Sequence, residues 1–373
     1  MRRISRRGIR VTVGAGMVVA VIASVSACSS NTPGSDGGTA SAGNSVADIV
    51  NYSGSDREQH LYQCAQAEGQ VTFYTSYSKA QDAVNAFEKD YPGVKVNLFQ
   101  SATDLVTRIN QEEQAGQHNF DVYDDILGGL TRDNNLFVEL DSPNQADMRT
   151  PDKYEMETRG SVLSVGYNTN EITGSEVPTD WKDLIDPKYA GKLFVNTAPS
   201  MPALIGFLAH VEGSDYVTAL AKNAKAQQLA SSGQRDQIIS GETPMGMLQS
   251  SAYYGLYTLD QGAPFGWSVM SPMMSEFAGI SISKNAAHPC AAALLTDWFT
   301  TKGGTAAQLA TTQRFSSPFK DDPILPFTIP GVDTSKLDII DKLDPSLWQG
   351  KYDSYAGYEQ ANEELFSQLF LNG

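Results

Sequence analysis

The stretch that most limits the possible folds of this chain is residues 71–96, VTFYTSYSKAQDAVNAFEKDYPGVKV. Its first residues are rich in β-branched and aromatic side chains and predict a strand, and a second short apolar run closes the stretch. Between them, apolar residues recur at helical spacing, at Ala80, Ala83, Val84 and Phe87. Ser78 and Gln81 fit a capping box at the start of that helix. The stretch is a βαβ half-unit and predicts an α/β fold with parallel strands.

The turn after the first strand is rich in hydroxyl groups. Thr75, Ser76 and Ser78 lie between the strand and the helix. In open α/β sheets, ligands bind at the carboxyl ends of the strands, where the helix N-terminus supplies unpaired N–H groups. The same turn occurs in any Rossmann-like domain, so this stretch alone leaves open whether it binds a ligand.

The first 27 residues differ from the rest of the chain. Five arginines precede an apolar run over residues 11–25, and the letters VSAC follow at 25–28. A charged start, a short apolar core and a small-residue site predict an export signal in residues 1–27, because the apolar run is too short to span a membrane. The arginines leave both the Sec and the twin-arginine export routes open. The ending resembles the lipobox of bacterial lipoproteins, which implies cleavage before Cys28 and a lipid on its sulfur; an ordinary secretory signal is the alternative.

The residues after this signal cannot build a core. Residues 29–46, SSNTPGSDGGTASAGNSV, are almost free of apolar side chains, so we expect a flexible tether within residues 28–54. The signal holds five of the 27 basic side chains and none of the 43 acidic ones, so the mature chain is more acidic than the formal net charge of −16. This charge argues against nucleic-acid binding through a basic face.

The rest of the chain repeats the strand, turn and helix order. Further strands are predicted at 94–99, 120–123, 162–168, 192–196, 245–249 and 280–283. Helices are predicted at 56–68, 105–116, 202–210, from 289 onward, and near the end around 358–370. The turn at 197–200, TAPS, repeats the hydroxyl-rich pattern of the first turn before a helix that opens with Pro202. A second α/β domain therefore presents a helix N-terminus of its own.

Two cysteines remain once Cys28 is taken by the lipid. In an oxidising compartment, Cys64 and Cys290 suggest one disulfide if the fold brings them together. Two unpaired buried thiols are the alternative.

Several phrases together resemble the extracytoplasmic solute-binding proteins of ATP-driven importers, in the branch that includes ferric-ion-binding proteins. The phrases are VTFYTSYS, AFEKDYPGVKV, FDVYDD, VPTDWKDLIDPKYAGKLFV, GAPFGW and ISKNAAHPCAAALLTDWF. They are spread over residues 71–299 in the family's order, and each is weak alone. The resemblance implies two Rossmann-like α/β lobes joined by crossing hinge strands, with the ligand in a cleft between them that closes by a hinge motion.

The resemblance also implies where the lobes lie in the sequence. The first lobe is expected at 55–126 plus 280–330, and the second at 127–279 plus 331–373. Cys64 and Cys290 then fall in one lobe, which favours their disulfide.

In ferric members of the family, two adjacent tyrosines late in the second lobe bind iron, and Tyr253 and Tyr254 fall at that place. Phenolate oxygens suit a hard, highly charged ion, and iron must displace their protons. Neighbours on a strand point to opposite faces, so both tyrosines reach one ion only where the strand has ended. The chain has 16 tyrosines, so an adjacent pair arises readily by chance and only its position gives it meaning.

The rest of the ferric pattern does not transfer. Ser78 stands where many ferric members have a histidine, and Ile126 stands where they have a glutamate. Other members bind phosphonates, sugar phosphates or thiamine-type compounds through hydroxyls and helix N-termini, and such organic ligands are collectively favoured over iron here. The expected ligand-binding residues are Ser76, Tyr77, Ser78, Asp124, Thr197, Ser200, Ser251, Tyr253 and Tyr254, with the last two as metal ligands if iron is the cargo.

The predicted function is therefore a lipoprotein on the outer face of the cell membrane that delivers a small ligand to an importer permease and its ATPase. We expect a monomer without a resident cofactor, in which ferric iron would be cargo. A sensory lipoprotein that presents its ligand to a membrane receptor needs the same cleft and stays an alternative. An exported enzyme is a second alternative, although residues 28–373 lack G-x-S-x-G, H-E-x-x-H, C-x-x-C and G-x-G-x-x-G motifs.

Overall fold

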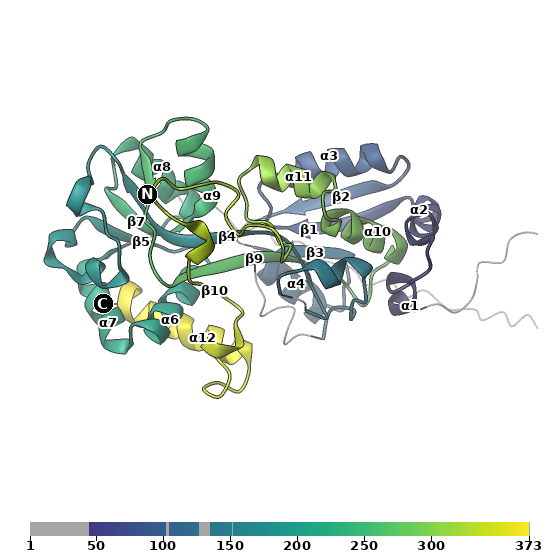
Figure 1. Cartoon of the computed structure of the whole chain (residues 1–373). Coiled ribbons are helices and arrows are strands. Elements are labelled where there is room, and N and C mark those ends of the chain that lie inside the picture. The colour runs from purple at the N-terminus through teal and green to yellow at the C-terminus, as the bar shows by residue number, and fades with distance from the viewer. Residues whose placement is uncertain (1–44, 102–103, 127–134, 151, 373) are drawn as a thin grey trace, which may run out of the picture. The chain divides into compact units, whose positions relative to one another are not determined.

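The computed structural model describes residues 45–101, 104–126, 135–150 and 152–372. Its described strands form one mixed sheet in the order β2-β1-β3-β9-β4-β7-β5-β6, with β10 paired to β9 and β8 paired to β4 (Figure 1). The export signal and Cys28 lie outside the described residues. No described helix is both long enough and apolar enough to cross a membrane.

The first part of the sheet has the parallel arrangement that the sequence predicts. It consists of β1 (Gln70–Thr75), β2 (Lys95–Gln100) and β3 (Val122–Asp125), with β1 parallel to both neighbours. The helices of this part are α2 (Arg57–Glu68), α3 (Ala80–Asp90), α4 (Leu105–Gln114), α10 (Pro289–Thr300) and α11 (Thr305–Thr312). The predicted capping box is wrong, because α3 begins one residue later, after Lys79, without a side-chain cap. Gln81 instead donates to Asn85.

Two long strands run through both parts of the sheet. They are β4 (Met156–Asn168) and β9 (Met273–Ile282). β9 pairs antiparallel with β3 and with β4, and the later residues of β4 pair with β7 (Figure 1). β4 begins six residues earlier than predicted and β9 begins seven residues earlier. These are the crossing strands that the resemblance implies.

The second part of the sheet repeats the parallel pattern. β5 (Leu193–Asn196) is parallel to β6 (Lys225–Gln227) and to β7 (Met245–Ser250). β8 (Phe265–Trp267) pairs antiparallel with β4, and β10 (Ile339–Asp341) pairs parallel with β9. The helices of this part are α6 (Met201–Val211), α7 (Ser214–Asn223), α8 (Ser231–Ser240), α9 (Ser251–Tyr253) and α12 (Tyr355–Phe366).

Buried apolar side chains form separate cores in the two parts, which we call the first and second lobes. The first lobe's main core gathers Phe73, Phe87, Ile282 and Leu294, and the second lobe's core gathers Trp181, Phe207, Met247 and Tyr358. Val138 and Leu140 pack in the first core, although the sequence assigns residues 127–279 to the second lobe. Val138 donates its N–H to the carbonyl of Ile282, which holds this segment against β9.

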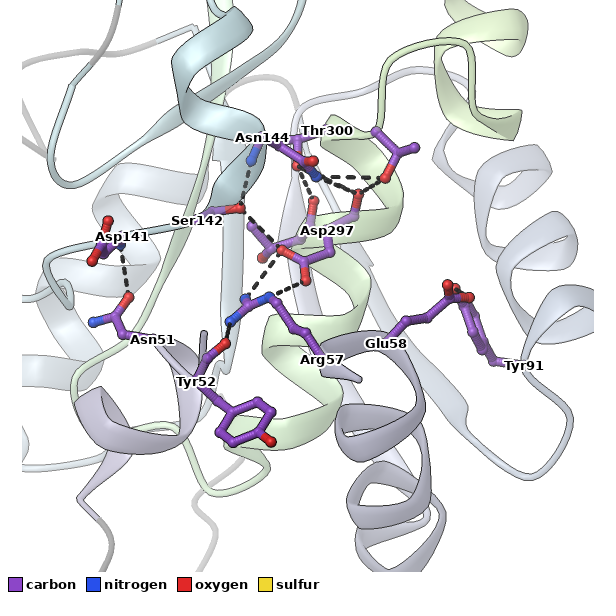
Figure 2. A network of polar contacts seen from close by, with 12 residues as sticks. Asn51, Tyr52, Arg57, Glu58, Tyr91, Asp141, Ser142, Asn144, Asp297 and Thr300 are labelled. Carbon is purple, nitrogen blue, oxygen red and sulfur yellow. Dashed lines mark hydrogen bonds and ion pairs between the residues drawn. The ribbon is translucent and has the colours of Figure 1, made fainter. Parts of the chain in front are cut away.

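A polar network fixes the N-terminal helices to the first lobe (Figure 2). Arg57 forms an ion pair with Asp297 of α10 at 2.6 Å, and Asp297 also accepts from Ser142. α1 (Val46–Val50) precedes this network, and Val50 is buried in the first core. Residues 46–50 are therefore folded, and the tether expected up to residue 54 extends too far.

Cys64 of α2 and Cys290 of α10 are joined by a disulfide that links residues 226 positions apart. Glu68 lies beside it and accepts from the backbone N–H groups of Cys290 and Ala291. A carboxylate at this place satisfies unpaired donors at the start of α10 and complements the helix dipole. The disulfide and the cap together hold α10 against α2.

Candidate functional site

The β1 turn, residues 75–78, is closed by hydrogen bonds within the protein. Asp124 lies at the end of the adjacent strand β3 and is completely buried. Its carboxylate accepts from the Thr75 hydroxyl at 2.6 Å. It also accepts from Arg159 Nη1, which lies 2.8 Å from one carboxylate oxygen and 2.9 Å from the other. Thr158 donates to the same carboxylate at 2.9 Å. Asp124, expected to bind ligand, is thus already saturated by its own protein.

The other residues of the β1 turn divide between packing and exposure. Tyr77 is buried, with the Arg159 guanidinium 4.1 Å from its ring centroid, and its hydroxyl accepts from Gln313 at 2.8 Å. Ser76 is half-buried, and its backbone N–H donates to the carbonyl of Asp124. Ser78 is exposed. Of this turn, only the Ser76 and Ser78 side chains lie near solvent.

The β5 turn, residues 197–200, leads into the N-terminus of α6. Thr197 is half-buried and its backbone N–H donates to the carbonyl of Leu229. Ser200 is buried and occupies the N-cap position of α6, but its hydroxyl makes no capping bond. It instead lies near the carboxylate of Glu276 and lowers the pKa of that group.

The predicted tyrosines follow directly on the end of β7. The strand ends at Ser250, whose hydroxyl caps α9 through the N–H of Ala252. Ser251 is completely buried, and its hydroxyl accepts from the backbone N–H of Val162. Tyr253 and Tyr254 are both half-buried, at the junction of α9 with the π-helix η5 (Tyr254–Leu259). The strand has ended before the tyrosine pair, as the sequence predicts, while Ser251 holds the backbone of β4.

Each tyrosine has a different neighbour. The Arg235 guanidinium of α8 lies 4.7 Å from the ring centroid of Tyr253 and 4.4 Å from that of Tyr257. Tyr254 packs against Phe327, with ring centroids 5.8 Å apart. Burial raises the pKa of both Tyr253 and Tyr254, and the Arg235 charge partly offsets the rise at Tyr253. Iron would have to displace protons that are held more firmly than in a free phenol.

One buried carboxylate at this place was missed by the sequence reasoning. Glu276 lies in β9, directly opposite Ser161 of β4, and is 8 % exposed. Burial raises the pKa of its carboxyl, and the positive charge of Lys342 acts in the opposite direction. The sequence feature that marks it is an acidic residue inside the apolar run MMSEFAGISI, residues 273–282. The strand was predicted to begin only at residue 280.

Lys342 and Asp125 complete the polar groups around Glu276. Lys342 is buried, and its ammonium donates to the carbonyl of Ile126 at 2.6 Å. Burial raises the pKa of the Asp125 carboxyl, and the nearby Ser76 side chain acts in the opposite direction. Lys342 follows β10, whereas Asp125 ends β3, so this group draws on the first lobe as well as the second. We call Glu276, Ser200, Lys342, Asp125 and Tyr253 the Glu276 group.

A model of the family described as bacterial extracellular solute-binding proteins matches residues 120–334, more than half of the chain. The chain belongs to this family. No curated protein sequence matches it. The match includes both crossing strands, the β5 turn and the tyrosine pair.

Solved structures show the same fold. The iron-bound HitA of Pseudomonas aeruginosa has a TM-score of 0.66 at 15% identity, covering 80% of this chain and 99% of its own. AfuA of Actinobacillus pleuropneumoniae, with fructose-6-phosphate bound, has a TM-score of 0.63 at 19% identity, covering 82% and 100%. A ferric binding protein of Campylobacter jejuni has a TM-score of 0.63 at 17% identity, covering 80% and 99%. The expected two-lobed periplasmic-binding-protein fold of type II is confirmed.

The Glu276 group and the two hydroxyl-rich turns are the polar groups of this solute-binding protein that can recognise a small ligand by hydrogen bonds. The Glu276 group offers a carboxylate and a phenol, and Tyr254 follows in the chain. Among the described residues, histidine, cysteine and acidic side chains come together as a metal-ligand set only at Cys64, Glu68 and Cys290. Those two sulfurs are already joined in the disulfide.

Proposed function

We propose that this protein is the substrate-binding lipoprotein of an ATP-driven importer, which captures one small ligand between its lobes and delivers it to a membrane permease without chemical change. The observation that carries the proposal is the family match, together with the polar groups that two lobes bring to the crossing strands. Lobes joined by such strands can close around a ligand by a hinge motion.

For the ligand, we propose a small organic molecule with an anionic group as the first candidate and ferric iron as the second. AfuA was solved with fructose-6-phosphate and HitA with iron, so both kinds of cargo occur on this fold. The organic candidate is favoured because hydroxyl groups that can hydrogen-bond such a molecule are present at Ser76, Ser78 and Thr197. The pKa values of the two tyrosines, raised by burial, work against iron.

For the anchor, we propose that Cys28 carries a lipid after export, and that the residues before α1 act as the tether. This places a monomeric binding domain at the outer face of the cell membrane, near its permease. Mass spectrometry of the protein from membranes should find a lipid-modified Cys28 at its N-terminus. A soluble, unmodified product that starts at another residue would contradict the anchor.

The ligand can be identified by thermal unfolding and calorimetry of the purified protein with ferric citrate, phosphonates and sugar phosphates. A true ligand raises the midpoint of unfolding because it binds only the folded state. If no compound of these classes binds, the importer proposal in this form fails.

Iron gives a separate and visible signal. If Tyr253 and Tyr254 bind ferric iron as phenolates, the loaded protein has a tyrosinate-to-iron absorption band that Tyr253→Phe or Tyr254→Phe removes. Tyr257→Phe is the matched control, since Tyr257 also lies against Arg235 but is not a proposed ligand. A protein that stays colourless with added ferric ion excludes iron through this pair.

A further inference from the structure

Glu276 is buried deeply, yet part of its carboxylate is left without a partner. The Ser200 side chain lies near the group, but Oε2 of Glu276 has no hydrogen-bond partner among the described residues. The great majority of buried polar atoms in proteins do have a partner, and an unpaired charged one is costly. Glu276 therefore lowers the stability of the protein in the form seen here.

The position of Glu276 places its carboxylate beside the groups expected to meet ligand. Glu276 lies opposite Ser161 of β4. The Ser161 hydroxyl accepts from that of Ser250, at 2.7 Å, and Ser250 is the residue immediately before α9. The negative charge of Glu276 also raises the pKa of Tyr253. The Glu276 carboxylate is thus near both the start of α6 and the tyrosine segment.

The same position changes what the N-terminus of α6 can bind. Ser200, which occupies the N-cap of this helix, lies beside the Glu276 carboxylate. A ligand anion at this helix start would meet a fixed carboxylate, which is unfavourable when both are charged. A hydroxyl or an ammonium group would instead supply the missing donor.

We propose that Glu276 is a ligand-binding residue that accepts a hydrogen bond from a hydroxyl or ammonium group of the imported molecule. The inference rests on the proposed importer function and narrows its substrate class. The cargo is a polyhydroxylated or amine-bearing compound, and an anionic group, where it has one, binds away from Glu276. An anion that carries no proton has no donor to offer and does not satisfy the site.

The test combines five probes with two variants of the full chain. The probes are glucose 6-phosphate, glucose, spermidine, sulfate and methanesulfonate, each titrated by calorimetry. The sugars and spermidine separate hydroxyl from ammonium donors, and the last two are fully ionised anions that have no hydrogen-bond donor. Glu276→Gln removes the charge at nearly constant shape. Glu157→Gln is the control, because Glu157 is a buried carboxylate on the neighbouring strand β4 whose Oε2 accepts from Thr150 N–H.

We expect a sugar or spermidine to bind, Glu276→Gln to weaken that binding at least about tenfold, and Glu157→Gln to change it less than about twofold. Unchanged binding in Glu276→Gln, or binding of sulfate and methanesulfonate alone, overturns the inference and leaves the importer function standing. Binding of no probe counts against both.

A second measurement needs no ligand. Because the unpaired carboxylate costs stability, Glu276→Gln added to Lys342→Met, which removes the opposing buried charge of Lys342, should unfold at a higher temperature than Lys342→Met alone. If the double variant unfolds at a lower temperature, Glu276 serves the fold and the inference is overturned.

Discussion

The two hydroxyl-rich turns share one local architecture but use their polar groups in opposite ways. At the β1 turn, Thr75 donates to Asp124 of β3, which also accepts from Arg159, and both Thr75 and Asp124 are completely buried. In the β5 turn, Ser200 contacts Glu276, which has an unpaired oxygen. Strand, turn and helix therefore do not by themselves make a binding site.

The two turns therefore differ in role, since a fully paired polar network keeps the protein rigid and a partly paired one can recognise a ligand. A buried, fully paired polar network fixes one geometry, whereas a partly paired one is unfavourable until something else completes it. Asp124 of β3 pairs with Arg159 of the crossing strand β4, and Thr75 of the β1 turn donates to the same carboxylate. We infer that the first lobe holds the crossing strands in place and that the second lobe supplies most of the ligand contacts.

The largest expected effect comes from breaking the buried ion pair. Arg159→Met leaves Asp124 charged, completely buried and without its cation, which should lower the free energy of unfolding by about 3–5 kcal/mol. Urea denaturation measures this change. The double variant Asp124→Leu with Arg159→Met should recover much of the loss, since apolar replacement of a whole buried pair is often neutral. A single variant as stable as wild type would refute the rigid role of the β1 turn.

The next effect concerns the covalent link of the first lobe. Cys64→Ser with Cys290→Ser removes a disulfide that closes a loop of 226 residues, and should lower the free energy of unfolding by about 2–5 kcal/mol. The loss is measured by urea denaturation under non-reducing conditions, with the wild type in reductant as the control. Ligand binding should change less than stability, because the proposed contacts lie mostly in the second lobe. Equal loss of both would contradict the division between the lobes.

The order of the elements could be predicted from the sequence because their cores are apolar and periodic. Strands β1, β5 and β7 and helices α2, α6 and α10 follow such patterns, and the phrases of the family supplied the two-lobed arrangement. The disulfide was one of two open alternatives until the family resemblance placed both cysteines in one lobe.

What the sequence could not reveal lies where polar residues are buried. β4 begins with Glu157 and Arg159 among its early residues, and β9 carries Glu276, so both strands begin earlier than their apolar runs suggest. The partners of these buried groups lie far away in the chain. Arg159 pairs with Asp124, and Glu276 lies beside Ser200. Local periodicity carries no information about such partners. For the same reason Asp124 was predicted as a ligand-binding residue and is an internal one.

A smaller effect compares the two turns directly by the same substitution. Thr75→Val removes the hydroxyl that donates to Asp124 and accepts from the N–H of Tyr77, so it should lower the free energy of unfolding by about 1–3 kcal/mol. Thr197→Val removes only a 3.5 Å contact to the carbonyl of Leu229 and should change stability by no more than about 0.5 kcal/mol. Thermal or urea unfolding of both variants measures the difference. Equal losses would show that the two turns are not organised differently.

The smallest effect, taken over one pH unit, concerns the carboxylates on the crossing strands. Burial, with the negative charge of Asp341, raises the pKa of Glu157 to about 8. The folded protein then keeps a proton that the unfolded chain releases above about pH 4.3, so the free energy of unfolding falls as pH rises towards 8.

Between pH 6 and pH 7, wild type should therefore lose up to about 1.4 kcal/mol more than Glu157→Gln, as measured by urea denaturation at each pH. Burial also raises the pKa of Glu276, so Glu276→Gln should flatten the same profile in the same direction. The two variants should differ in a second respect, because only Glu276→Gln is expected to weaken ligand binding. If both weaken it alike, the carboxylates act through the crossing strands together, and the contrast between a structural strand β4 and a ligand-contacting strand β9 is lost.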